Sequence, residues 1–390
     1  MKGRTLDVHA GRELLARQGV HVPPIDLSTT YPLYNAALGT QSIDAWARGE
    51  GEAASPVYAR LYNPTVAGFE RALADLEGAE AAVAYASGMA AVTAVLLANP
   101  GHVVGVRPVY GGTDHLLASR LLGHTVTWVQ PEDVAAAIRD DTVLVWIETP
   151  ANPTLQLVDI AAVVAQAGSV PVVVDNTFAT PVLQQPLALG ARYVLHSATK
   201  FLGGHGDVVG GVVACAEEDA RALRQVRVAT GGILHPLAGY LLHRGLQTLT
   251  LRVRAAQDGA MALVERLRAH PMVFAVHYPG CEHTDPTGLV GRQMHGPGSV
   301  LAFDVGSREI ARTIMGSLRL ITPAVSLGSV DTLIQHPASL THRVVEDDAK
   351  SASGVSAGLL RLSVGIEEPD SLWRDLSQAF EQWVPALAAR

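Results

Sequence analysis

The chain has 390 residues, of which 48% are hydrophobic and 17% are charged, and its formal net charge is -8. This composition excludes a largely disordered chain and supplies enough apolar side chains for a core divided between two domains. The negative balance argues against a nucleic-acid or membrane-surface partner, because such partners favour basic proteins.

The sequence also argues against secretion, membrane insertion and metal binding. Cys215 and Cys281 are the only cysteines, and they form neither a disulfide framework nor a metal motif. The first residues contain no apolar signal core, and no apolar run approaches the roughly 18 residues of a membrane span. The 15 histidines include no HExxH pair, so we expect no metal. We therefore predict a soluble, cytoplasmic protein.

Residues 1–55 carry loop signals such as Pro23-Pro24 and lack strong periodicity. We expect them to form an N-terminal arm that contacts a neighbouring subunit. From 56 to 240, helical and strand patterns alternate. Helices are predicted at 66–76 and 90–97, and short apolar strands at 82–85, 102–106, 143–147, 170–174, 193–196 and 208–214. This alternation predicts an α/β domain with a mostly parallel sheet buried on both faces.

The pattern changes in residues 241–390. A long helical stretch at 241–267 precedes strand candidates at 274–278, 300–305 and 359–364, and a final helix is predicted at 370–387. This order indicates a smaller α+β C-terminal domain. We find no internal repeat and no low-complexity segment.

Lys200 lies in the most informative run of the chain, Ser197-Ala198-Thr199-Lys200-Phe201-Leu202-Gly203-Gly204. A deprotonated lysine amine condenses with aldehydes to form a Schiff base. The neighbouring hydroxyls can donate to a phosphate, and the glycines allow the backbone to approach a ligand closely. This environment suits a lysine that binds pyridoxal 5'-phosphate (PLP). The alternative is an ordinary lysine at a surface turn.

Asp175 ends the buried strand candidate at 170–174. A carboxylate there needs a cationic partner, and a pyridinium nitrogen is one. Such a pair keeps the cofactor ring protonated so that it accepts electrons from a substrate. A carboxylate that caps the next segment or binds a core arginine is the alternative. Because ligands bind beyond the carboxyl ends of parallel strands, we expect Asp175 and Lys200 at the same sheet edge.

Four further segments are candidates for the same site. Gly88 and Met89 follow Ser87 where a strand turns into a helix, which suits phosphate, although Ser87 could simply cap its own helix. Tyr110, beside two glycines, could stack on a ring and transfer protons or simply pack.

Tyr58 and Arg60, before a helix start, could bind phosphate or belong to a helix cap. Arg361, within an apolar strand, could bind a substrate carboxylate or form an internal salt bridge. The sequence contains no GxxxxGK[ST] loop, and the Gly203–Gly206 glycines do not fit a dinucleotide-binding motif.

Together these runs resemble the Cys/Met-metabolism family of PLP-dependent enzymes, which includes cystathionine γ-lyase, methionine γ-lyase and cystathionine γ-synthase. The matching runs extend from Val22-Pro23-Pro24-Ile25 to Arg361-Leu362-Ser363-Val364-Gly365. The resemblance implies a fold-type-I PLP-dependent transferase fold, PLP as cofactor and a homotetramer built from two active dimers.

Site roles follow from the resemblance by position. It implies that Lys200 binds the PLP aldehyde, that Tyr110 stacks on the ring and assists proton transfer, and that Arg361 with Ser326 binds the substrate carboxylate. The other implied cofactor-binding residues are Tyr58 and Arg60 toward the neighbouring subunit's phosphate, and Gly88, Met89, Asn152, Asp175, Thr177, Ser197 and Thr199.

The run at 325–342 resembles the γ-lyases most. The sequence departs from family patterns at three places: Gly112 stands where methionine γ-lyases usually have cysteine, Arg227-Val228 replaces their Lys-Asp, and Asp331 replaces a glutamate that is frequent in the cystathionine enzymes. The expected reaction is α,γ-elimination on L-cystathionine or L-methionine, giving 2-oxobutyrate, ammonia and a thiol. One alternative is γ-replacement, as in cystathionine γ-synthase or an O-acyl-homoserine sulfhydrylase. Another is a binding or regulatory protein that keeps the fold without the chemistry.

Overall fold

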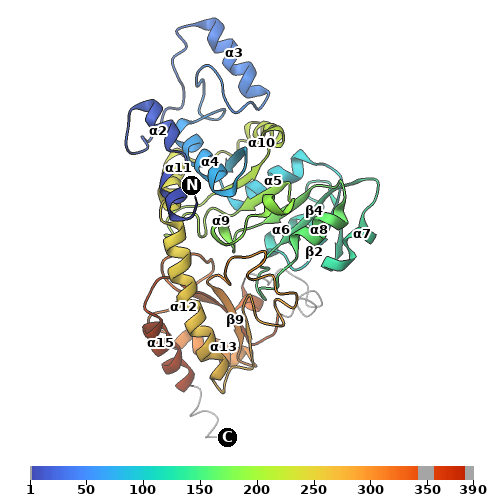
Figure 1. Cartoon of the computed structure of the whole chain (residues 1–390), viewed down its shortest axis with the longest axis vertical. Coiled ribbons are helices and arrows are strands. Elements are labelled where there is room, and N and C mark those ends of the chain that lie inside the picture. The colour runs from blue at the N-terminus through green and yellow to red at the C-terminus, as the bar shows by residue number, and fades with distance from the viewer. Residues whose placement is uncertain (1, 341–354, 383–390) are drawn as a thin grey trace.

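The computed structural model describes residues 2–340 and 355–382 (Figure 1). The helix predicted at 370–387 is α15 (Pro369–Glu381), and its expected last residues lie outside the described ranges. No helix of the described residues is long and apolar enough to cross a membrane.

The N-terminal arm contains helices, whereas the sequence indicated only loops. They are α1 (Arg4–His9), α2 (Arg12–Gln18) and α3 (Ala36–Ala47). The Asn35 side chain accepts hydrogen bonds from the amides of Ala37 and Leu38 and so caps α3, a local signal that the search for periodicity missed. Figure 1 shows α3 at one end of the molecule, away from both sheets.

A seven-stranded sheet of the described residues forms the large domain. Its strand order is β1-β7-β6-β5-β4-β2-β3, and its strands are parallel except β7, which runs antiparallel to β1 and β6. The bounds are β1 (Ala81–Tyr85), β2 (His102–Val106), β3 (Thr125–Val129), β4 (Thr142–Glu148), β5 (Val172–Asp175), β6 (Tyr193–His196) and β7 (Gly211–Cys215).

The predicted mostly parallel sheet is confirmed, with two corrections. Strand β7 begins at Gly211 rather than at 208. Strand β3 was not predicted. It is an edge strand, its residues are all only partly buried, and threonines stand at alternate positions. Such a strand lacks the continuous apolar run that marks the inner strands.

Helices cover both faces of this sheet. They are α4 (Pro64–Glu77), α5 (Gly88–Ala98), α6 (Gly111–Ala118), η1 (Pro131–Asp133), α7 (Val134–Ala137), α8 (Ile160–Ala167), α9 (Thr180–Leu183), η2 (Pro186–Leu189), α10 (Glu217–Thr230) and α11 (Pro236–Leu246). The buried side chains of α4 and α11 join one apolar cluster with β1, β6 and β7, while those of α5 and α10 join another. The sheet is therefore buried on both sides, and its strand ends hold the polar groups.

The long helical stretch predicted at 241–267 is two helices, α11 and α12 (Leu249–Ala269). The break lies beside the Lys200 loop: a Cβ on Gly245 would lie 2.4 Å from the carbonyl oxygen of Leu202. Arg252 bridges the two parts, because its guanidinium donates to the carbonyl oxygens of Phe201 and Gly245, at 2.7 Å each. The break thus lets helix backbone pack against the loop that carries Lys200.

A second sheet, of five strands in the described residues, lies at the other end of α12 (Figure 1). Its order is β10-β11-β12-β9-β8. The bounds are β8 (Ala275–His277), β9 (Val300–Asp304), β10 (Thr322–Pro323), β11 (Leu333–Gln335) and β12 (Leu359–Ser363), with α13 (Arg308–Ser317), η3 (Pro337–Ser339) and α15. Its core includes Leu263, Phe303, Leu360 and Phe380. The expected smaller α+β unit is therefore present, and β12 carries Arg361.

Candidate active site

The carboxyl ends of β4, β5 and β6 border a cavity of about 290 Å³. This is where an open parallel sheet binds ligands. Of the site residues predicted from the sequence, the structure brings eleven into the cavity lining: Gly88, Met89, Tyr110, Asn152, Asp175, Thr177, Ser197, Thr199, Lys200, Ser326 and Arg361. Residues more than 270 positions apart in the chain therefore share one pocket.

One end of the cavity suits an anion. Helix α5 begins there, with Ser87 as its N-cap and the Ser87 hydroxyl accepting from the Ala90 amide at 3.1 Å. Close packing requires glycine, because a Cβ on Gly88 would lie 3.0 Å from the Ser197 Cβ, and one on Gly211 would lie 2.1 Å from the Ser87 carbonyl oxygen. Free helix amides beside serine and threonine hydroxyls can hold a phosphate.

Asp175 supplies a buried carboxylate at the end of β5. It accepts from the Thr177 amide at 3.0 Å and from the Thr177 hydroxyl at 2.5 Å, and that hydroxyl accepts from the Ser197 amide. Burial raises the pKa of Asp175 above its usual range. No ion pair joins this carboxylate to a side chain among the residues described. A protonated pyridine nitrogen would provide the missing positive charge, so the donor set fits PLP.

Lys200 lies opposite, with its Nζ donating to the Ser326 hydroxyl at 2.7 Å. Burial, and then the nearby charge of Arg361, lowers the pKa of the Lys200 amine to about 8. A much larger fraction of this amine is therefore neutral and nucleophilic near neutral pH than in an exposed lysine. Ser326 holds a left-handed conformation with φ of 92°, a strained geometry of the kind found at functional sites.

Arg361 reaches the cavity from β12 of the second sheet. Its Nη1 donates to the Asn152 Oδ1 and its Nη2 to the Ser326 carbonyl oxygen, both at 2.7 Å. Burial lowers the pKa of Arg361 to about 10, while Glu148 acts in the opposite direction. Both of these hydrogen bonds end on uncharged oxygens, and the guanidinium lies in the lining of the cavity.

Tyr110 precedes α6 and is 43% exposed, on the open side of the cavity. Gly112 fits closely against its ring, since a Cβ there would lie 2.6 Å from the Tyr110 Cε1 and 3.0 Å from the Met89 Sδ. Any larger residue at position 112 would therefore move the ring or the methionine.

Tyr58 and Arg60 do not line this cavity. Tyr58 is exposed, and Arg60 donates from Nη1 to the Val228 carbonyl oxygen at 2.8 Å on the outer surface of the large domain. Within one chain, the structure does not bring these two predicted phosphate ligands to the other eleven residues.

Glu148 and Phe178 are among the lining residues that were not predicted from the sequence. The Arg361 guanidinium lies 5.9 Å from the Phe178 ring centre. Glu148 ends β4 as Asp175 ends β5, so the reasoning that selected Asp175 applied to it equally. Phe178 carried no comparable signal.

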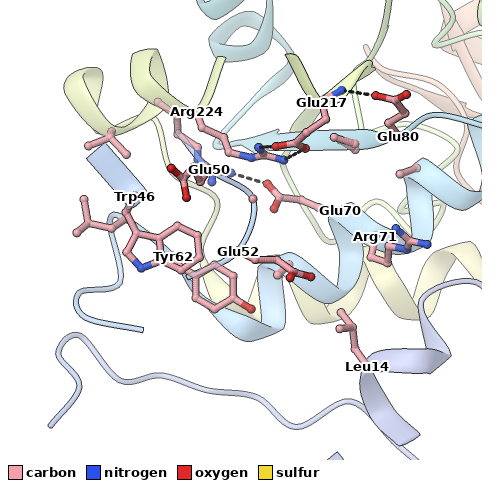
Figure 2. Close-up of a pocket in the computed structure, with 18 of the residues that line it drawn as sticks. Leu14, Trp46, Glu50, Glu52, Tyr62, Glu70, Arg71, Glu80, Glu217 and Arg224 are labelled. Atoms are coloured by element: carbon pink, nitrogen blue, oxygen red, sulfur yellow. Dashed lines mark hydrogen bonds and ion pairs between the residues drawn. The ribbon is translucent and has the colours of Figure 1, made fainter. Parts of the chain in front are cut away.

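A larger cavity, of about 500 Å³, lies between the arm, α4 and α10 (Figure 2). It is lined by many charged side chains, including Glu70, Glu217, Arg224 and Arg227. It contains none of the predicted site residues. Across residues 2–340 and 355–382, no group of three or more His, Cys, Asp or Glu side chains is placed to hold a metal ion.

Comparisons with known proteins agree with this geometry. The model of the Cys/Met metabolism PLP-dependent enzyme family matches residues 4–381. An L-methionine γ-lyase of Brevibacterium sandarakinum is 56% identical over 98% of each chain, and one of Streptomyces avermitilis is 58% identical over 96% of this chain and 89% of its own.

Solved structures give the same result. Cystathionine γ-lyase of Lactobacillus plantarum, complexed with L-serine, matches with a TM-score of 0.90 and 35% identity over 98% of this chain and 99% of its own. Cystathionine γ-synthase of Xanthomonas oryzae pv. oryzae, with aminoacrylate and cysteine, gives 0.89 and 36% over 98% of each. The chain therefore belongs to the Cys/Met metabolism family of PLP-dependent enzymes, and within it is a carbon–sulfur lyase.

Proposed function

We propose that this protein catalyses α,γ-elimination on L-methionine, with L-cystathionine as the second substrate to consider. Methionine and water would give 2-oxobutyrate, ammonia and methanethiol. The observation that carries the proposal is the grouping of Lys200, Asp175 and Arg361 around one cavity, with a lysine pKa of about 8. The relatives at 56% and 58% identity are L-methionine γ-lyases, which favours methionine over cystathionine.

Each residue has a defined task in this proposal. PLP, when bound, supplies an electron-withdrawing ring that makes the substrate Cα–H acidic. Lys200 would attach the cofactor aldehyde, then take the proton at Cα and move protons at Cβ. Asp175 would keep the pyridine nitrogen protonated, and Arg361 would bind the α-carboxylate through its guanidinium fork. Tyr110 would lie over the ring and donate a proton as the γ-sulfur leaves.

The cofactor contacts are part of the proposal. The amides and hydroxyls of Gly88, Met89, Ser197 and Thr199 would bind the phosphate, and Asn152 and Thr177 would lie beside the ring. All six residues line the same cavity, which supports this assignment.

A γ-replacement reaction is the second candidate, because the cystathionine γ-synthase structure has nearly the same fold. The two reactions diverge only at the end, where replacement adds a thiol to the unsaturated intermediate that elimination hydrolyses. The test is to incubate the PLP-loaded enzyme with L-methionine or L-cystathionine, without a thiol acceptor, and to quantify 2-oxobutyrate. Rapid release supports elimination. No release, together with turnover of an O-acyl-homoserine only when cysteine or sulfide is added, would establish replacement instead.

We further propose a cytoplasmic homotetramer built from two active dimers, in which Tyr58 and Arg60 bind the phosphate of the neighbouring subunit. Both lie outside the cavity of their own chain. The arm exposes apolar side chains, among them Leu27 at 64% and Tyr34 at 97%, which a second copy would cover.

In this proposal, residues 1–55 are the contacting arm, 56–240 the PLP-binding domain and 241–390 the C-terminal domain. The free, buried cysteines Cys215 and Cys281 support a reducing compartment.

Subunit complementation tests the shared site. K200A and R60A are each expected to be weakly active, but a mixed dimer contains one site with both wild-type residues. Random mixing should restore about one quarter of wild-type activity. Activity no greater than the average of the separate variants would contradict the sharing of sites.

A further inference from the structure

Glu148 and Asp175 form a pair of buried carboxylates that the proposed roles use only in part. They end neighbouring parallel strands, are paired in register, and are 4% and 8% exposed. Both line the same cavity. Two buried carboxylates side by side are unfavourable unless positive charge or donors compensate each of them. The surroundings of Glu148 therefore need an explanation of their own.

The two oxygens of Glu148 bind two different loops. Its Oε2 accepts from the Tyr110 amide at 2.6 Å, and its Oε1 accepts from the Asn152 amide at 3.0 Å. One side chain thus fixes the backbone that carries the Tyr110 ring and the backbone that carries the Asn152 side chain. These loops follow β2 and β4, which are neighbouring parallel strands of the sheet.

The connection continues to the second sheet. The Asn152 Oδ1 accepts from the Arg361 Nη1, and the Arg361 Nη2 donates to the Ser326 carbonyl oxygen. A displacement of Glu148 would therefore move the residue proposed to bind the substrate carboxylate, through one intermediate side chain.

The two hydrogen bonds use both oxygens of Glu148 as acceptors. Both contacts are N–H donors, and a carboxylate offers acceptor lone pairs on both oxygens. Burial and the neighbouring Asp175 raise the pKa of Glu148 well above its usual range, while the two amides and Arg361 lower it. Arg361 is therefore a nearby positive charge that favours the carboxylate form of Glu148.

We propose that Glu148 is a positioning residue that sets the places of Tyr110 over the cofactor and of Arg361 at the substrate carboxylate. This inference rests on the proposed function for the roles of Tyr110 and Arg361.

The test variant is E148Q, which keeps the shape but directs an NH₂ group at one of the two amide donors. In the PLP-loaded enzyme, we measure KM and kcat for L-methionine. We also measure the dissociation constant of L-norleucine, which has the same carboxylate and chain length but no sulfur to eliminate, from the change in the cofactor's visible absorption. E148Q should raise both KM and the norleucine constant about 10- to 100-fold, with a smaller effect on kcat. Cofactor content should stay within about twofold of wild type.

Asp375→Asn is the matched control. Asp375 is also a buried carboxylate that accepts from backbone amides, those of Arg319, Leu320 and Ile321, but it lies in the C-terminal sheet domain away from the cavity. D375N should lower the unfolding temperature without changing KM or norleucine binding. E148D keeps both acceptor oxygens on a shorter side chain and should recover part of the loss.

Unchanged norleucine affinity in E148Q would overturn the proposal, as would an equal loss in D375N. If E148Q does not fold, E148D carries the test with an expected loss of about 3- to 10-fold. Failure of the proposed function would look different from failure of this inference. In the first case the wild-type enzyme would release no 2-oxobutyrate, but norleucine binding could still be compared between the wild type and the variants.

Discussion

The two charged cavities of this molecule differ in how their charges are paired. In the larger cavity beside the arm, Arg227 pairs with Glu70 at 2.5 Å. Arg224 pairs there with Glu217 at 2.6 Å (Figure 2). In the smaller cavity at the sheet edge, the Lys200 amine binds a hydroxyl, and Asp175 binds an amide and a hydroxyl. In the larger cavity these two arginines are held in ion pairs, whereas in the smaller one the hydrogen bonds of Lys200 and Asp175 go to uncharged groups.

The pKa shifts follow the same division. Burial lowers the pKa of Lys200 to about 8 and raises that of Asp175. Burial alone would also lower the pKa of Arg224, but Glu217 reverses the effect and the net shift is upward. Perturbed pKa values of residues that line a cleft are typical of functional sites, and they favour the smaller cavity.

The largest expected effect is at Lys200. K200A should lower kcat for 2-oxobutyrate release at least about 1,000-fold, because it removes both the attachment point and the base. Product formation would be measured by coupled reduction of the oxo acid. Residual activity within tenfold of wild type would contradict the assignment of this lysine.

Arg361 is expected to affect binding more than chemistry. R361Q should raise KM for L-methionine about 10- to 100-fold, equivalent to roughly 1.5–3 kcal/mol for lost hydrogen bonds to a charged group. Steady-state kinetics would measure the change. An unchanged KM would show that the substrate carboxylate binds elsewhere.

Cofactor attachment should depend on pH through Lys200. Only the neutral Lys200 amine attacks the PLP aldehyde. The rate at which PLP attaches to the cofactor-free enzyme should therefore rise with pH and level off near the Lys200 pKa of about 8, whereas an ordinary lysine would level off near 10.5. In R361Q, the loss of a positive neighbour raises the pKa of Lys200, so the plateau should move to higher pH. Stopped-flow absorbance would follow attachment, and a wild-type rate still rising steeply above about pH 9.5 would contradict the lowered pKa.

The smallest expected effect is in the arm-side cavity. Glu217 is 36% exposed at its side chain, so E217Q breaks a partly solvated ion pair. It should change the free energy of unfolding by less than about 1 kcal/mol and leave KM and kcat within about twofold of wild type. Urea denaturation with parallel kinetics would check this. A large loss of activity would break the contrast between the two cavities.

Periodicity predicted the inner strands well, because β2 and β6 are continuous apolar runs buried on both faces. Periodicity failed where tertiary contacts determine the helix ends. The break between α11 and α12 lies where Gly245 packs against the Leu202 carbonyl oxygen, and no local sequence pattern encodes that contact. In the site, strand ends and the family resemblance identified Lys200, Asp175 and Arg361. Its place at a strand end could have identified Glu148 as a site residue, but its contacts with the amides of two loops appear only in the folded chain.

The most direct test of the sheet-edge site is to identify the lysine that binds PLP. The holoenzyme is reduced with borohydride, which makes the aldehyde–lysine linkage permanent, and the modified peptide is found by mass spectrometry. The only other lysines in the sequence are Lys2 and Lys350. The account predicts that the label is on Lys200. Label on Lys2 or Lys350, or none in an enzyme that contains PLP, would contradict it.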